Sequence, residues 1–157
     1  MSALITSQEY ELSSIINTGP WSTLRGATIV DIGGSHGDVV IAVARAYPSL
    51  QFVVQDLPET IDSRPLIPGE LESRITFMAH DFFTPQPVKN ADLYFFRWIF
   101  HNWSDKYCLL ILRYLILALK PQARILIVDF CLPEPNTTDL LAERQIRCVH
   151  FNSRWLS

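Results

Sequence analysis

The segment Ala27-Thr-Ile-Val-Asp-Ile-Gly-Gly-Ser-His-Gly37 decides the fold of this chain. A short β-branched run that stops at clustered glycines is typical of a buried strand that enters a tight turn. Beyond the turn, apolar residues recur at helical spacing from Val40 to Tyr47, and Pro48 ends that pattern. The segment therefore predicts a strand, a turn and a helix in direct succession.

Similar units follow along the rest of the chain. Further strands are predicted at 51–55, 74–78, 91–96 and 124–129, helices at 106–119 and 137–150, and a broken helix with a loop at 59–72. Strands that alternate with helices form a doubly wound, parallel α/β sheet. We expect one domain over 1–157, made of a leading helix and loop at 1–26, a core at 27–135, and a C-terminal helix and tail at 136–157.

Composition excludes several classes of protein. The chain has 157 residues, of which 48% are hydrophobic and 18% are charged, so it can bury a core and is not a disordered chain. The net charge of −3 and the lack of a basic run argue against nucleic-acid binding through phosphate neutralisation. The apolar run from Tyr107 to Leu119 is too short to span a bilayer, and the N-terminus has no secretory-signal pattern, so no membrane partner is expected.

Cysteine usage bears on the compartment and on metal binding. The three cysteines, Cys108, Cys131 and Cys148, are an odd number and form no CxxC pair. Neither a disulfide scaffold nor a structural zinc site fits this pattern. We therefore expect no metal site and a cytoplasmic location, where thiols stay reduced.

Polar residues follow the predicted strands at the points where the strands end. These residues are Asp31 with the turn Gly33–Gly37, Asp56, Asp81, His101 and Asp129. Because the carboxyl ends of parallel strands share one edge of a sheet, we expect these side chains to converge on a ligand there.

The glycine turn indicates the kind of ligand. A dinucleotide fingerprint needs glycine where this chain has Ser35 and Asp38, and no Lys-Ser or Lys-Thr pair follows as in a phosphate-binding loop. Asp38 would also repel a pyrophosphate, which favours an adenosyl compound without phosphates. Asp56 is then placed to accept hydrogen bonds from ribose hydroxyls. The alternative is a structural strand-to-helix turn whose acid stabilises the start of the helix.

Five segments, in order along the chain, resemble one enzyme family. They are Val30-Asp-Ile-Gly-Gly-Ser-His-Gly37, Val54-Gln-Asp-Leu-Pro58, His80-Asp-Phe-Phe83, Arg97-Trp-Ile-Phe-His-Asn-Trp-Ser-Asp105 and Val128-Asp-Phe-Cys-Leu-Pro133. They are similar to the S-adenosylmethionine-dependent O-methyltransferases of the caffeic acid type, and most similar to the fungal secondary-metabolism branch. The resemblance extends from about Ser22 to Pro135. It implies a Rossmann-like class I methyltransferase sheet. It also implies an enzyme that transfers a methyl group to a hydroxyl of a small aromatic or polyketide-type metabolite and releases S-adenosylhomocysteine.

The resemblance also implies a cofactor site. Its implied residues are Asp31, Gly33, Gly34, Ser35, Gly37, Asp56, Leu57, Asp81, Phe82 and Arg97. The glycine turn would lie beside the methionine part of the cofactor, Asp56 on the ribose, and Asp81 with Phe82 around the adenine. Arg97 stands where the plant enzymes have a lysine that contacts the cofactor.

The catalytic residues implied by the resemblance are His101 and Asp129. A neutral histidine titrates in the range needed to take the proton of a phenol. A carboxylate on its other nitrogen would fix the tautomer. The plant enzymes have glutamate at the position of Asp129, so the carboxylate here is one methylene shorter. The alternative for His101 is a histidine at a strand end that is satisfied by a backbone carbonyl.

The resembled family continues past the fifth strand, so the sheet is expected to be truncated there, with the fifth strand at its edge. The helix at 107–119 is apolar nearly all round. An exposed strand edge and an apolar helix both favour self-association or a partner chain. Two function classes stay open: an O-methyltransferase acting on a phenolic or enolic hydroxyl, and a methyltransferase-like protein without methyl transfer. The second would bind the cofactor structurally and act as a partner subunit or in another natural-product reaction.

Overall fold

The computed structural model describes residues 12–130 and 146–152. After a helix at 12–18, its elements are η1 (Trp21–Thr23), β1 (Thr28–Ile32), α2 (Asp38–Ala46), β2 (Gln51–Asp56), α3 (Pro58–Asp62), η2 (Gly69–Leu71), β3 (Ile75–Ala79), β4 (Leu93–Arg97), η3 (Phe100–Asn102), α4 (Asp105–Ile116), β5 (Arg124–Phe130) and β6 (Ile146–Asn152). Here η marks a short 3-10 helix. The helices and strands predicted before residue 130 are all present, with bounds that differ by a few residues.

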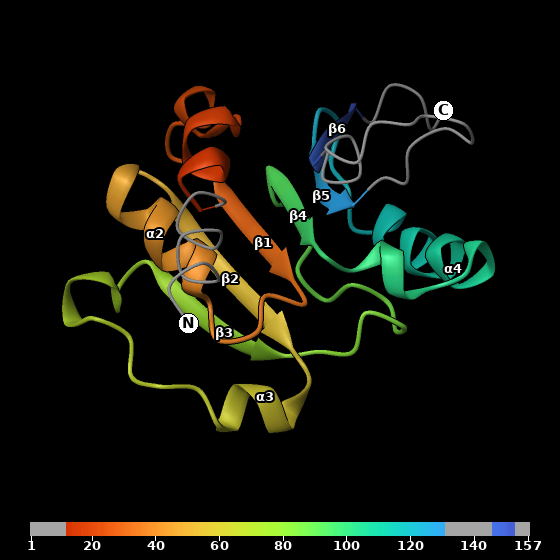
Figure 1. Cartoon of the computed structure of the whole chain (residues 1–157), viewed down its shortest axis with the longest axis horizontal. Helices are drawn as coiled ribbons and strands as arrows, with labels where there is room; N and C mark the ends of the chain where they lie inside the picture. The colour runs from red at the N-terminus through yellow and green to blue at the C-terminus, as the bar shows by residue number, and fades with distance from the viewer. Residues whose placement is uncertain (1–11, 131–145, 153–157) are drawn as a thin grey trace, which may run out of the picture.

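The strands form one sheet in the order β3-β2-β1-β4-β5-β6. The pairs among β1 to β5 are all parallel, and the strands fan out between α2 and α4 (Figure 1). The order reverses beside β1, because β2 follows it on one side and β4 lies on the other. The predicted doubly wound α/β fold is therefore confirmed, with its switch point at the glycine turn after β1.

Each strand sends alternate side chains into one of two apolar clusters. In β4, Phe95 belongs to the cluster that contains the α2 residues, whereas Tyr94 and Phe96 belong to the cluster that contains Ile111 and Leu115 of α4. This alternation is the period of two expected for a strand that is covered on both faces. The sheet thus has a helix layer on each side, and its ends remain open for loops.

The C-terminal part of the sheet differs from the prediction. A helix was expected at 137–150, but residues 146–150 lie in β6, and residues 137–145 fall outside the described residues. The fifth strand was expected at the sheet edge, but β6 pairs with β5 in antiparallel register, with Val128 opposite Cys148. Pairing supplies partners for backbone N–H and C=O groups that an edge strand leaves open.

Helix α4 is covered less than its composition suggests. Only Ile111 and Leu115 of the helix are buried, whereas Leu109 is 54% exposed and Leu117, just after the helix, is 76% exposed. Ser104 is at the N-cap position, as predicted, but its side chain makes no capping hydrogen bond. Within 12–130 and 146–152, no helix is long and apolar enough to cross a membrane.

Candidate cofactor and proton-transfer site

The glycine turn after β1 lies directly against the end of β2. The backbone N–H groups of Gly33 and Gly34 both donate to the carbonyl oxygen of Gln55, at 2.8 and 3.0 Å. Gly33 has a φ of 72°, and a Cβ there would lie 2.5 Å from Cδ1 of Ile99. Both the backbone conformation and the close approach require glycine at this position.

Asp56, at the end of β2, closes this turn. Its Oδ2 accepts the backbone N–H of Ser35 at 2.8 Å, and its Oδ1 accepts the N–H of Leu57 at 2.8 Å. A carboxylate oxygen has two lone pairs, so each oxygen can still accept a hydroxyl hydrogen. Asp56 can therefore hold the turn and bind a ribose at the same time.

A pocket of about 360 Å³ opens beside Asp56. Its lining residues are Gly33, Asp56, Leu57, His80, Asp81, Phe82, Phe83, Ile99 and Trp103. The volume lies in the range of small-molecule sites, and aromatic or apolar walls with a few polar groups are usual for such sites. Aromatic walls with carboxylates at the rim fit the adenine and ribose of an adenosyl compound.

The loop after β3 forms one wall of this pocket. Oδ1 of Asp81 accepts the backbone N–H of Phe83 at 2.9 Å, which shapes the turn that carries Phe82. Phe82 and Phe83 both contact the ring of Trp103 edge to face. Burial lowers the pKa of His80, partly opposed by the neighbouring Asp81, so this imidazole is neutral at neutral pH.

Asp31 lies beneath the turn and does not line the pocket. It is only 2% exposed, and its Oδ2 lies 2.5 Å from the point where a Cβ on Gly34 would be. Burial raises its pKa from 3.8 to about 7, attraction to Arg97 opposes this, and repulsion from Asp56 adds to it. A small residue at position 34 is therefore needed to leave room for this buried carboxyl.

Arg97 ends β4 on the same edge of the sheet. Its guanidinium carbon lies 3.8 Å from the centre of the Trp98 ring, a distance typical of a cation–π contact. Trp98 has a φ of 57°, which is rare for a bulky residue and costs on the order of 1–3 kcal/mol. This reversal of the backbone turns the chain from β4 into η3.

Asp129 makes two contacts with His101 and a third with the preceding residue, Phe100. Nδ1 of His101 lies 2.5 Å from Oδ1 of Asp129. Oδ2 of Asp129 accepts the backbone N–H groups of Phe100 at 2.8 Å and of His101 at 3.2 Å. Asp129 is buried, whereas the side chain of His101 is 34% exposed. One carboxylate thus orients both the imidazole and the short η3 turn that carries it, despite its shorter side chain.

The structure separates the predicted cofactor residues into two groups. Gly33, Asp56, Leu57, Asp81 and Phe82 line the pocket together. Asp31, Gly34, Ser35, Gly37 and Arg97 are at the same edge of the sheet but are not in its lining. Four lining residues were not predicted: His80, Phe83, Ile99 and Trp103. Each of them lies within a segment that carries the resemblance. The sequence motifs therefore contain these residues but do not show which side chains point into the pocket.

Within the described ranges, no group of three or more His, Cys, Asp or Glu side chains could hold a metal ion. The polar groups of the site are instead carboxylates, an imidazole and backbone N–H groups, which suit an organic ligand.

Residues 2–151 match the family described as the O-methyltransferase domain. The chain belongs to this family. The resemblance carried by the five segments is therefore confirmed, and with it the Rossmann-like fold. One relative is the grayanic acid biosynthesis cluster O-methyltransferase of Cladonia grayi, 54% identical over 144 residues, which are 86% of this chain and 32% of the relative. The chain thus spans about a third of the length of this curated relative.

Solved structures of the same fold match most of the chain. Human N-acetylserotonin methyltransferase, in complex with S-adenosylmethionine, matches with a TM-score of 0.72 and 26% identity over 89% of this chain and 39% of that protein. A protein described as a pericyclic reaction enzyme matches with a TM-score of 0.61 and 32% identity over 80% of this chain and 32% of that protein. Solved proteins with this fold therefore include a methyltransferase and an enzyme described by a different reaction.

Proposed function

We propose that this chain is the cofactor-binding and proton-accepting part of a fungal O-methyltransferase that uses S-adenosylmethionine in secondary metabolism. The acceptor is a phenolic or enolic hydroxyl of a small aromatic or polyketide-type metabolite. The observation that carries the proposal is the 2.5 Å contact between His101 and Asp129. It is supported by Ile99, which lines the cofactor pocket and directly precedes the turn that carries His101.

The pocket residues divide the binding of the cofactor between them. Asp56 accepts the ribose hydroxyls with the lone pairs that Ser35 and Leu57 leave open. Phe82 and Leu57 enclose the adenine, and the turn at Gly33 lies beside the methionine part. When bound, S-adenosylmethionine supplies a sulfonium methyl group, and the acceptor oxygen displaces the sulfur to leave S-adenosylhomocysteine.

His101 accepts the proton of the acceptor hydroxyl. An ionised Asp129 accepts only, so Nδ1 of His101 donates to it, and Nε2 is left with its lone pair. Nε2 can then take the hydroxyl proton as the new oxygen–carbon bond forms. Asp129 stabilises the imidazolium that results and keeps the ring in this orientation.

We further propose that this reaction takes place in the cytoplasm and that the chain forms a homo-oligomer or binds a partner chain. The support for association is the apolar surface of Leu109 and Leu117 on and after α4.

A second candidate function is a reaction of a natural product without methyl transfer. The neighbour described as a pericyclic reaction enzyme favours it. In that case the chain would still bind the cofactor, and the His101–Asp129 pair would polarise a hydroxyl or carbonyl without methylation.

Calorimetric titration with S-adenosylhomocysteine tests the cofactor site. We expect the purified chain to bind with micromolar affinity and Asp56→Ala to weaken binding at least about tenfold, because a charged hydrogen bond contributes roughly 1.5–3 kcal/mol. The matched control is Asp62→Ala, which removes an exposed aspartate at the end of α3. Absence of binding by the parent chain, or equal loss in both variants, would overturn the assignment.

Incubation with S-adenosylmethionine and a panel of phenols, followed by mass spectrometry, separates the two functions. Products that carry one added methyl group support the O-methyltransferase. Products of unchanged mass but altered retention support the second candidate.

A further inference from the structure

A pair of buried amides lies behind the cofactor pocket. The side chain of Gln55 is fully buried, and Gln86 is 5% exposed. Gln55 immediately precedes Asp56 in β2, and Gln86 follows the loop that carries Asp81 and Phe82. Neither residue lines the pocket, and neither is among the residues assigned to the cofactor.

The two amides bind each other in both directions. Nε2 of Gln55 donates to Oε1 of Gln86 at 2.9 Å, and Nε2 of Gln86 donates to Oε1 of Gln55 at 2.8 Å. Oε1 of Gln86 also accepts the backbone N–H of Val88 at 3.0 Å. A buried amide costs free energy unless it is hydrogen-bonded, so each side chain depends on the other.

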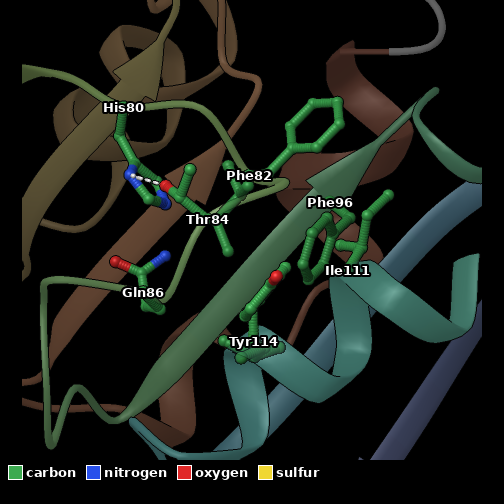
Figure 2. Close-up of a pocket in the computed structure, with 9 residues that line it drawn as sticks. His80, Phe82, Thr84, Gln86, Phe96, Ile111 and Tyr114 are labelled. Atoms are coloured by element: carbon green, nitrogen blue, oxygen red, sulfur yellow. Dashed lines mark hydrogen bonds between the residues drawn. The ribbon is translucent and has the colours of Figure 1, made fainter. Parts of the chain in front are cut away.

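The pair connects the segments that form the pocket. The carbonyl oxygen of Gln55 accepts the N–H groups of the turn at Gly33 and Gly34, and the N–H of Gln86 donates to the carbonyl oxygen of Tyr114 in α4 at 3.3 Å. Figure 2 shows Gln86 beside a narrow cavity that Phe82 and Tyr114 also line. One hydrogen-bonded unit thus reaches the glycine turn, the loop after β3, and α4.

We propose that Gln55 and Gln86 are positioning residues that set the spacing between the glycine turn and the loop carrying Asp81 and Phe82. This spacing fixes the width of the pocket, so the pair determines the affinity of the chain for an adenosyl ligand. The inference rests on the proposed cofactor function. An apolar pair would fill the same space, but it would not fix the loop in one register along β2, because apolar contacts are not directional.

The test compares Gln55→Leu, Gln86→Leu and the double variant by titration with S-adenosylhomocysteine and by thermal unfolding. Each single variant leaves one buried amide without its partner amide, so both stability and affinity fall, the affinity about tenfold. The double variant removes both amides and regains part of this stability, because two apolar groups can replace a hydrogen-bonded pair at little cost, although the N–H of Val88 still loses its acceptor. Its affinity stays at least about tenfold below the parent if the pair positions the loop. Recovery of both stability and affinity would mean a merely structural role and would overturn the proposal.

Gln55→Glu adds a readout that does not depend on apolar packing. A protonated carboxyl has one donor and one acceptor, as the amide needs here, whereas a carboxylate only accepts. We expect the affinity of Gln55→Glu, relative to the parent at the same pH, to recover as the pH falls from about 8 to about 5, because burial raises the pKa of a carboxyl. A ratio that does not change with pH, with the variant folded, counts against the proposal.

Val43→Ala is the matched control for loss of stability alone. Val43 is buried in α2, in the cluster on the other face from α4. This variant should unfold at lower temperature and bind S-adenosylhomocysteine as the parent does. If the parent itself fails to bind, the proposed function fails; if it binds and the glutamine variants bind equally well, only the present inference fails.

Discussion

The pKa of an aspartate is shifted in opposite directions at the two ends of the parallel strands. At the amino ends, Asp92 accepts the backbone N–H of Thr28 at 2.8 Å and pairs with Lys120 at 2.5 Å. Burial raises its pKa, but these hydrogen bonds and the charge of Lys120 outweigh that, and the net pKa is lowered. At the carboxyl ends, burial raises the pKa of Asp31 to about 7.

Charge compensation, and not backbone strain, distinguishes these two edges. Left-handed backbone occurs at both, at Ser35 and Trp98 on the carboxyl side and at Asn90 and Gln122 on the amino side. The paired Asp92 stabilises the fold, whereas the ionised form of Asp31 costs free energy. An edge that keeps a buried acid at such a cost is the edge expected to carry function.

The largest contrast between the edges concerns the rate of methyl transfer. We expect His101→Ala to lower kcat by about 10²–10⁴-fold, the usual contribution of a general base, with little change in S-adenosylhomocysteine affinity. Lys120→Ala, at the opposite edge, should leave kcat unchanged and lower stability by less than about 1 kcal/mol, since its ion pair is partly exposed. Methylation of the same phenol at the same rate by both variants would remove His101 from the mechanism.

A second contrast concerns the sign of the pH dependence of stability. The pKa of Asp31 in the folded state is above its ordinary value of 3.8. The stability that this carboxyl contributes is therefore fully present below pH about 4 and is lost as the pH rises to about 7. Asp31→Asn does not titrate and should gain stability relative to the parent across this window. Each pKa unit corresponds to about 1.4 kcal/mol, so the gain amounts to a few kcal/mol.

Asp92 should show the reverse. Its pKa is lowered, so its contribution is present above its ordinary pKa of 3.8 and is lost as the pH falls through the lowered value. Asp92→Asn should therefore be less stable than the parent at pH 7, by less than about 1 kcal/mol because the side chain is 34% exposed. In acid, its stability should approach that of the parent. Urea denaturation from pH about 2 to about 8 covers the titration windows of both groups. Stability differences from the parent that change with pH in the same direction for both variants would contradict the comparison.

The sequence predicts the carboxyl edge well because that edge follows from order along the chain. Alternating strands and helices predict a parallel sheet, and a parallel sheet brings its strand ends together. Asp56 and Asp81 therefore meet at one pocket without any knowledge of side-chain contacts. Ser104 shows the limit of local patterns, because it is at the predicted N-cap and makes no capping bond.

Contacts between distant residues could not be predicted in this way. The Gln55–Gln86 pair joins positions 31 residues apart, and Asp129 reaches two backbone N–H groups through the geometry of η3. The strand β6 replaces part of an expected helix because pairing with β5 depends on a partner that lies outside the local pattern.

The smallest contrast uses two glycines of nearly identical backbone conformation. Gly33 at the carboxyl edge has a φ of 72°, and Gly26, just before β1, has a φ of 70°. Alanine at either position costs about 1–2 kcal/mol for the left-handed backbone, and the close approach to Ile99 adds to this cost at Gly33, so chemical denaturation should give a loss of stability at both positions and the larger one at Gly33. At Gly26 a Cβ meets nothing within 4 Å, whereas at Gly33 it meets Ile99 at 2.5 Å and pushes that side chain at the pocket wall. Only Gly33→Ala should therefore weaken S-adenosylhomocysteine binding, by about tenfold, a loss of roughly 1.4 kcal/mol. Equal affinities of the two variants would mean that the turn lies farther from the ligand than its place in the pocket indicates.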